Sequence, residues 1–187
     1  MKTLFINATV LETSRTLNLT RHLLKYYGDI HEVDLKNDIV PPIDNETFNV
    51  KYGALEKGDF SHPSLKNAML LKEAETLIIA APIWNVGFPA SLKAFLDDAI
   101  ITNLTFKYGP NGTIISLCNV KKVILVSTAG GKLIEEHTIN FVKDFSKMFL
   151  ACEDITLYKA EFLDVFKDKV EEILNETKSI IDNDYNK

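Results

Sequence analysis

The chain has 187 residues, enough for one domain with a sizeable core, and its 46% hydrophobic and 25% charged residues argue against disorder. A net charge of -5 disfavours nucleic acid as a partner, because neutralising phosphates requires a basic surface. No apolar run reaches membrane-spanning length, and the first residues lack a secretory hydrophobic region with a cleavage site. We therefore expect one cytoplasmic domain, residues 1–187, with no membrane partner.

The first part of the chain alternates short apolar segments with amphipathic ones. Continuous apolar runs predict buried strands, alternation predicts a strand near a sheet edge, and helical spacing after a capping residue predicts a helix. We predict, in order, a strand at Lys2–Asn7, a helix from about Thr13 or Ser14, an edge strand at Asp29–Leu35, a long irregular stretch from Asp38 to Pro63, and a helix at about Ser64–Ala74. Irregular stretches of such length are usually functional or contact a partner.

The most informative segment runs from Leu77 to Ile100. It begins as a continuous apolar run typical of a strand buried on both faces, and Pro82 ends that run. Pro89 then opens a helix whose apolar residues recur at helical spacing. The loop between the prolines is rich in aromatic and apolar residues and needs a partner to cover it. It either binds a flat aromatic ligand or packs Trp84 and Phe88 into the core or an oligomer contact.

The rest of the chain continues the alternation of strands and helices. We predict a hairpin from Thr105 to Ile115 with its turn at Gly109–Gly112, a strand at Val123–Val126 ending in Ser127–Gly131, a helix at about Leu133–Phe149, a strand at Asp154–Leu157, a helix at about Asp164–Asp182, and a frayed tail at Asn183–Lys187. We find no internal repeat or linker.

This alternation predicts an α/β fold with a parallel sheet and helices on both faces. Five strands, the second one amphipathic, favour a flavodoxin-like three-layer sandwich with a five-stranded parallel sheet in the order 2-1-3-4-5. The ligand crevice of such a fold lies outside the carboxyl ends of the strands, beside the first and third. The loops after the first, third and fourth strands therefore converge on one rim.

The loop after the first strand has the composition of an anion site. Ser14, Thr16 and Asn18 offer side-chain donors, Arg15 offers a positive charge, and the start of a helix offers free backbone N–H groups. Plain helix capping explains one hydroxyl but not the cluster. The sequence contains neither GxGxxG nor GxxxxGK[ST], so it supports neither a Rossmann dinucleotide site nor a P-loop.

Other reactive side chains show no catalytic or metal-ligand spacing. The four histidines are scattered, Cys118 and Cys152 are expected to be buried thiols, and no metal is predicted. His137 follows the pair Gly130-Gly131, so a role near the crevice stays open. The glycine pair itself is either a tight turn or a place where backbone approaches a planar ring. No general acid or base is visible, and a flavin would not require one from the protein.

Pro82–Asp97 closely resembles the P-M-Y-N-F-x-x-P-x-x-L-K-x-x-x-D signature of the FMN-dependent NADH azoreductases and NAD(P)H:quinone oxidoreductases. The resemblance covers nearly the whole chain and includes Ser14–Asn18, Thr105–Tyr108 and Thr128–Gly131. It implies a flavodoxin-like homodimer with one FMN per subunit near the dimer interface. The flavin would take a hydride from NADH or NADPH and pass electrons to quinones or azo compounds.

The resemblance also implies roles for individual residues. The phosphate of FMN would be held by Ser14, Thr16 and Asn18 with Arg15 alongside, one side of the isoalloxazine would be lined by Pro82, Ile83, Trp84, Asn85 and Val86, and its other edge by Thr128, Ala129, Gly130 and Gly131. Trp84 replaces the usual tyrosine, Val86 the usual phenylalanine, and Ala129 a position that is often arginine. We expect these departures to affect the choice of acceptor more than FMN binding.

We therefore predict an FMN oxidoreductase with one open flavin face and ping-pong kinetics. The alternative is a flavodoxin-like electron carrier without a substrate pocket, although carriers usually show a strongly acidic docking face. A hydrolase without flavin ranks last, because neither a nucleophile nor a base is visible. In a homodimer, Phe106, Tyr108 or Phe162 of the neighbouring subunit is expected to complete the pocket.

Overall fold

The structure is a computed structural model that describes residues 2–132 and 135–186. Five parallel strands form one sheet in the order β2-β1-β3-β6-β7, with β1 at Thr3–Asn7, β2 at Ile30–Asp34, β3 at Thr76–Ala80, β6 at Lys122–Thr128 and β7 at Ile155–Ala160. Numbered without the hairpin strands, this is the predicted order 2-1-3-4-5. The flavodoxin-like fold is therefore confirmed.

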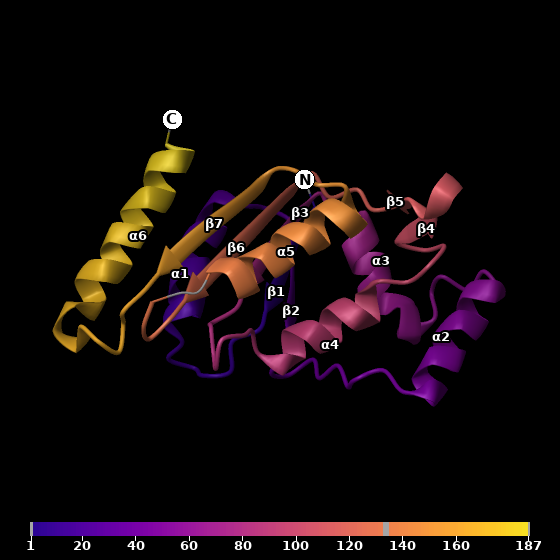
Figure 1. Ribbon diagram of the computed structural model, residues 1–187, viewed down its shortest axis with the longest axis horizontal. Coiled ribbons are helices and arrows are strands. Elements are labelled where there is room, and N and C mark those ends of the chain that lie inside the picture. The colour runs from indigo at the N-terminus through magenta and orange to yellow at the C-terminus, as the bar shows by residue number, and fades with distance from the viewer. Residues whose placement is uncertain (1, 133–134, 187) are drawn as a thin grey trace.

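Helices cover both faces of the sheet (Figure 1). One layer contains α3 (Lys66–Glu73), α4 (Ala90–Ala99) and α5 (Glu135–Leu150), and the other contains α1 (Arg15–Leu23) and α6 (Val170–Tyr185). Alternate side chains of a strand lie on opposite faces of the sheet, so Leu77 and Ile79 pack with the first layer and Ile78 packs with the second. Among the described residues, no helix has both the length and the apolar character that crossing a membrane requires.

The strand β3 is the centre of the sheet. All its residues are fully buried, and its ladder pairs Leu77 with Leu4 on one side and with Val123 on the other. A strand with neighbours on both sides and helices on both faces can carry no polar alternation. This explains why its sequence is a continuous apolar run.

The predicted hairpin is confirmed as a separate two-stranded sheet of β4 (Phe106–Tyr108) and β5 (Ile114–Ser116). Phe106 is buried and packs edge-on against Phe149 of α5, with ring centroids 5.2 Å apart. Its neighbour Tyr108 is exposed. Figure 1 shows the hairpin and α2 at the end of the molecule opposite to α6.

The predicted irregular stretch between Asp38 and Pro63 is wrong, because it contains the helix α2 (Asn45–Glu56). Asp44 caps this helix by accepting a hydrogen bond from the backbone N–H of Thr47 at 2.8 Å. The helix buries only Lys51 and Ala54, so its sequence lacks a wide apolar stripe.

The carboxyl-terminal predictions also need correction. The last helix begins at Val170, after a 3₁₀ turn at 167–169, and not near Asp164. It runs to Tyr185, so the predicted frayed tail is wrong: Tyr185 stacks on Tyr26 with ring centroids 4.8 Å apart. Hydrogen bonds from Tyr26 and His22 lower the pKa of the nearby Asp182 carboxyl. Leu133, the predicted start of α5, lies outside the described residues.

One buried ion pair attaches α2 to the rest of the molecule. Lys51 Nζ donates to the backbone oxygen of Asp98 at 2.6 Å and forms an ion pair with its carboxylate, which also accepts from Asn67 Nδ2 at 2.9 Å. The side chains of Lys51 and Asp98 are 3% and 14% exposed. Removing the lysine would leave the carboxylate buried without its cation.

We predict that Lys51→Met lowers the free energy of unfolding by about 3 kcal/mol, because a buried charge loses its partner. The control is Lys93→Met on α4, whose ion pair with Asp97 is about half exposed and should cost at most about 0.5 kcal/mol. Urea unfolding followed by circular dichroism measures both. Equal losses in the two variants would contradict the role assigned to Lys51.

Candidate functional site

A cleft of about 340 Å³ opens where the loops after β1, β3 and β6 meet. The predicted residues on its lining are Ser14, Arg15, Thr16, Pro82, Ile83, Trp84, Thr128, Ala129 and Gly130. The predicted residues Asn18, Asn85, Val86 and Gly131 do not line it, and their contact with a ligand stays a prediction. The lining also includes residues that the sequence did not single out, namely Val10, Leu11, Thr13, Leu163 and Asp164.

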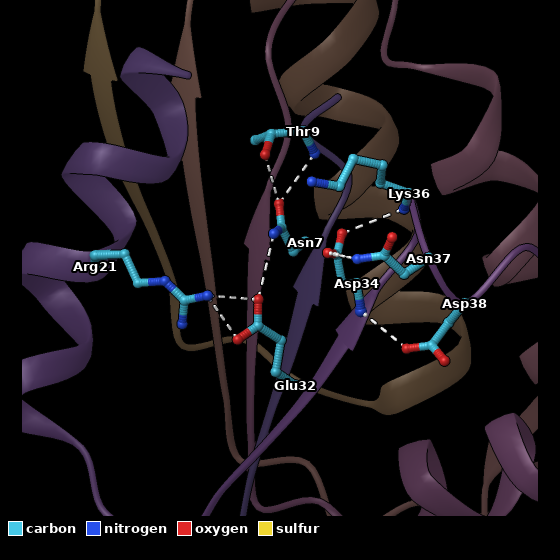
Figure 2. Close-up of polar contacts among 8 residues, drawn as sticks. All are labelled: Asn7, Thr9, Arg21, Glu32, Asp34, Lys36, Asn37 and Asp38. Carbon is cyan, nitrogen blue, oxygen red and sulfur yellow. Dashed lines mark hydrogen bonds and ion pairs between the residues drawn. The ribbon is translucent and has the colours of Figure 1, made fainter. Parts of the chain in front are cut away.

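Asn7, at the end of β1, fixes the start of the first loop (Figure 2). Its Oδ1 accepts hydrogen bonds from the backbone N–H of Thr9 at 3.1 Å and from the Thr9 hydroxyl at 2.7 Å. Its Nδ2 donates at 3.2 Å to Glu32 of β2, which forms an ion pair with Arg21 of α1. The loop is therefore tied to the neighbouring strand and to the helix that follows it.

The same figure shows how the chain turns after β2. Asp34 accepts from the backbone N–H of Lys36 at 3.2 Å and from Asn37 Nδ2 at 2.7 Å, and its own N–H donates to Asp38 at 3.2 Å. Lys36 also forms an ion pair with Glu12 in the first loop. This turn therefore supports the first loop from the side of β2.

The predicted start of α1 at Ser14 is confirmed. The Ser14 hydroxyl caps the helix by accepting from the backbone N–H of Leu17 at 3.2 Å. The hydroxyls of Thr16 and Thr128 lie 2.7 Å apart and are buried, which joins the first turn of α1 to the end of β6. One of these hydroxyls donates to the other, so the acceptor keeps its own proton for a further hydrogen bond.

The loop after β3 ends in a tight turn. Trp84 and Gly87 exchange two backbone hydrogen bonds of 2.8 and 2.9 Å, and between them Asn85 and Val86 have φ values of 49° and 68°. Asparagine tolerates this left-handed conformation, whereas a β-branched valine rarely adopts it. The side chains of Trp84, which lines the cleft, and of Val86 in this turn are about half exposed.

The loop after β6 is held by the segment that follows β7. Backbone N–H groups of Phe162, Leu163 and Asp164 donate to the carbonyls of Gly131, Ala129 and Gly130 at 3.0, 3.2 and 2.9 Å. This pairing brings the Asp164 carboxylate into the cleft, where its Oδ1 lies 2.8 Å from Arg15 Nη1. The sequence placed Asp164 at the start of a helix and gave no signal of this long-range contact.

The described residues offer no metal centre and no activated thiol at this site. No group of three or more histidine, cysteine, aspartate or glutamate side chains among them could hold a metal ion. Burial raises the pKa of the Cys118 thiol to about 11 and also raises that of Cys152, and neither lines the cleft. The His137 side chain lies outside the described part of the chain.

The fold and the position of this cleft define a flavodoxin-like protein with a ligand crevice at the carboxyl ends of its strands. A family model described as flavodoxin-like fold matches residues 1–178, and the chain belongs to this family.

Curated relatives and a solved structure agree with this assignment. The chain is 32% identical to the FMN-dependent NADH:quinone oxidoreductase of Coprothermobacter proteolyticus, over 86% of this chain and 85% of the relative. It is 34% identical to the protein of the same name from Lachnoclostridium phytofermentans, over 95% and 94% of the two chains. An FMN-dependent NADH-azoreductase from Bacillus anthracis, solved in complex with FMN, has the same fold with a TM-score of 0.77, 22% identity, and coverage of 97% and 98%. The resemblance to this family is therefore confirmed.

The two neighbouring glycines differ in the space around them. A Cβ at Gly130 would lie 2.2 Å from Asp164 Oδ2, whereas a Cβ at Gly131 would meet no atom within 4 Å. We predict that Gly130→Ala lowers the free energy of unfolding by about 1–2 kcal/mol through this overlap. Gly131→Ala serves as the control and should change it by less than about 1 kcal/mol. Thermal unfolding compares them, and equal stability would contradict the close approach of Asp164.

Proposed function

We propose that this protein is an FMN-dependent oxidoreductase that transfers electrons from NADH to quinones or aromatic azo compounds. The observation that carries the proposal is the cleft where the loops after β1, β3 and β6 meet, because its lining combines the Arg15 cation and the start of α1 with apolar side chains of the loop after β3. The relatives support this proposal, because two are FMN-dependent NADH:quinone oxidoreductases and the solved structure is an FMN-dependent NADH-azoreductase. Use of NADPH stays a prediction.

The residues at the α1 end of the cleft fit a phosphate. Arg15 and Thr16 occupy the first turn of α1, where backbone N–H groups have no carbonyl partner within the helix. The positive end of the helix dipole and the Arg15 guanidinium favour an anion there. Ser14 and Thr16 would hold the phosphate with Arg15, and Asn18 in the next turn stays a predicted contact.

The residues of the loops after β3 and β6 fit a flat ring. Pro82, Ile83 and Trp84 contribute apolar lining to the cleft, while Thr128 and Gly130 contribute a hydroxyl and backbone. The ring would lie between these loops, with Asn85, Val86 and Gly131 as further predicted contacts. The cleft volume lies within the usual range for small-molecule sites.

Bound FMN would supply the redox chemistry by accepting a hydride and passing electrons on. The protein's own part is to bind, orient and exclude water. Backbone N–H groups in the loops around Asn85 and Gly130 would favour negative charge on the ring, and Trp84 would shape the face that meets the substrates. No side-chain acid or base is assigned.

We predict that Arg15→Met weakens FMN binding at least about tenfold, because a charge-assisted hydrogen bond contributes roughly 1.5–3 kcal/mol. Riboflavin has no phosphate and should bind the variant and the parent equally. The control is Arg21→Met, on the same helix but paired with Glu32 outside the cleft. Quenching of flavin fluorescence measures all affinities, and an unchanged FMN affinity in Arg15→Met would contradict the phosphate assignment.

The kinetic mechanism is proposed to be ping-pong. With one ring face resting on protein and the other open to the mouth of the cleft, only one planar partner can stack at a time. NADH would therefore have to bind, deliver its hydride to the flavin and leave as NAD⁺ before a quinone binds. Steady-state rates at several quinone concentrations should give parallel double-reciprocal lines, and intersecting lines would require a ternary complex.

We further propose a homodimer. Leu11 and Trp84 on the cleft lining and Val86 in the turn after Trp84 are 61%, 44% and 54% exposed, a large apolar surface for one subunit to leave in water. Tyr108 and Phe162 are exposed and available to a second copy, whereas Phe106 is buried within its own subunit. Light scattering should report a dimer at micromolar concentration. A fully active monomer would refute this proposal.

A further inference from the structure

The cleft contains a charge that the proposed function does not use. Arg15 is the only basic residue and Asp164 the only acidic residue among the described residues that line it. Asp164 Oδ1 lies 2.8 Å from Arg15 Nη1, and its Oδ2 lies against the backbone of Gly130. The carboxylate is therefore already paired with the cation that a phosphate would need.

Backbone contacts bring this carboxylate to the cleft. The N–H of Asp164 donates to the carbonyl of Gly130 at 2.9 Å, and the N–H of Leu163 donates to that of Ala129 at 3.2 Å. The chain reaches this position through Phe162, whose φ of 62° lies in the left-handed region that non-glycine residues rarely adopt. The position of Asp164 is thus set by the segment after β7 and not by a side-chain rotamer alone.

The ion pair itself is exchangeable. The side chains of Arg15 and Asp164 are 39% and 67% exposed, and pairs this accessible to water contribute little to stability. A phosphate that approaches Arg15 would carry more charge than the carboxylate and could replace it as the partner of the guanidinium. The Asp164 carboxylate would then remain near the bound phosphate and repel it.

We propose that Asp164 is a specificity-determining residue that competes with the ligand's phosphate for Arg15. In the free protein its carboxylate neutralises the guanidinium, and in the complex it weakens binding of phosphate-bearing flavins relative to neutral ones. The inference rests on the proposed function, because it takes FMN as the ligand. If Asp164 instead held Arg15 in place for the phosphate, its removal would have the opposite effect.

The test compares the parent with Asp164→Asn, which keeps the shape and removes the charge, and with Asp164→Ser as a second neutral variant. Asp168→Asn is the control, since it changes the net charge equally at a residue that does not line the cleft. Quenching of flavin fluorescence gives the dissociation constants of FMN and riboflavin for each folded protein. Both neutral variants should bind FMN about tenfold more tightly, with riboflavin and the control unchanged.

Three results would overturn the inference: unchanged FMN affinity in Asp164→Asn, weaker FMN binding, or equal tightening of FMN and riboflavin. The proposed function would survive each of them as long as the parent binds FMN. If no form binds either flavin, the proposed function fails, and inorganic phosphate then decides the inference. For each protein, the rise in Tm with phosphate is compared with the rise with chloride of equal ionic strength. A larger excess for phosphate in Asp164→Asn than in the parent supports the inference, and an equal excess in the two proteins overturns it.

Discussion

The position of β3 between β1 and β6 determines where the loops that form the cleft lie. Its backbone is paired on both sides, and its side chains are buried on both faces, so the strand cannot shift without exposing apolar residues or breaking two ladders. Because the three strands are parallel, their carboxyl ends share one edge of the sheet. The loops that follow them are brought together there, although they are far apart in the sequence.

The loops are then joined to one another by a few polar contacts. The Thr16–Thr128 hydroxyl pair links the first turn of α1 to the end of β6, and the N–H of Ile83 in the loop after β3 donates to the carbonyl of Thr128 at 2.9 Å. Thr128 thus contacts both α1 and the loop after β3. The cleft keeps its shape through these contacts, which is the condition for binding a rigid cofactor without a large ordering cost.

The strands of the sheet could be predicted from the sequence, because each strand has a recognisable pattern in its own residues. The continuous apolar run of β3, the alternation of β2 and the capping serine of α1 each act within a few residues. Most of the cleft lining could also be predicted, since the sheet order alone places the loops after β1, β3 and β6 together.

The features that the sequence could not supply depend on distant partners. The helix α2 lacks the wide apolar stripe that identifies a helix locally, and its contacts are with residues distant in the sequence: Lys51 pairs with Asp98 on α4, and Ala54 packs in a small apolar cluster. Asp164 reaches the cleft through backbone bonds to Gly130, which no local pattern encodes. The left-handed turn at Val86 contradicts the residue's own preference and is imposed by the turn from Trp84 to Gly87.

If the cleft holds a flavin that NADH can reduce, the visible absorption spectrum of the FMN-loaded protein should show it directly during a titration with NADH in the absence of oxygen. We expect stoichiometric NADH to bleach the flavin bands and a quinone then to restore them. A bound flavin that NADH does not bleach would contradict the proposed oxidoreductase and favour an electron carrier without a nicotinamide site.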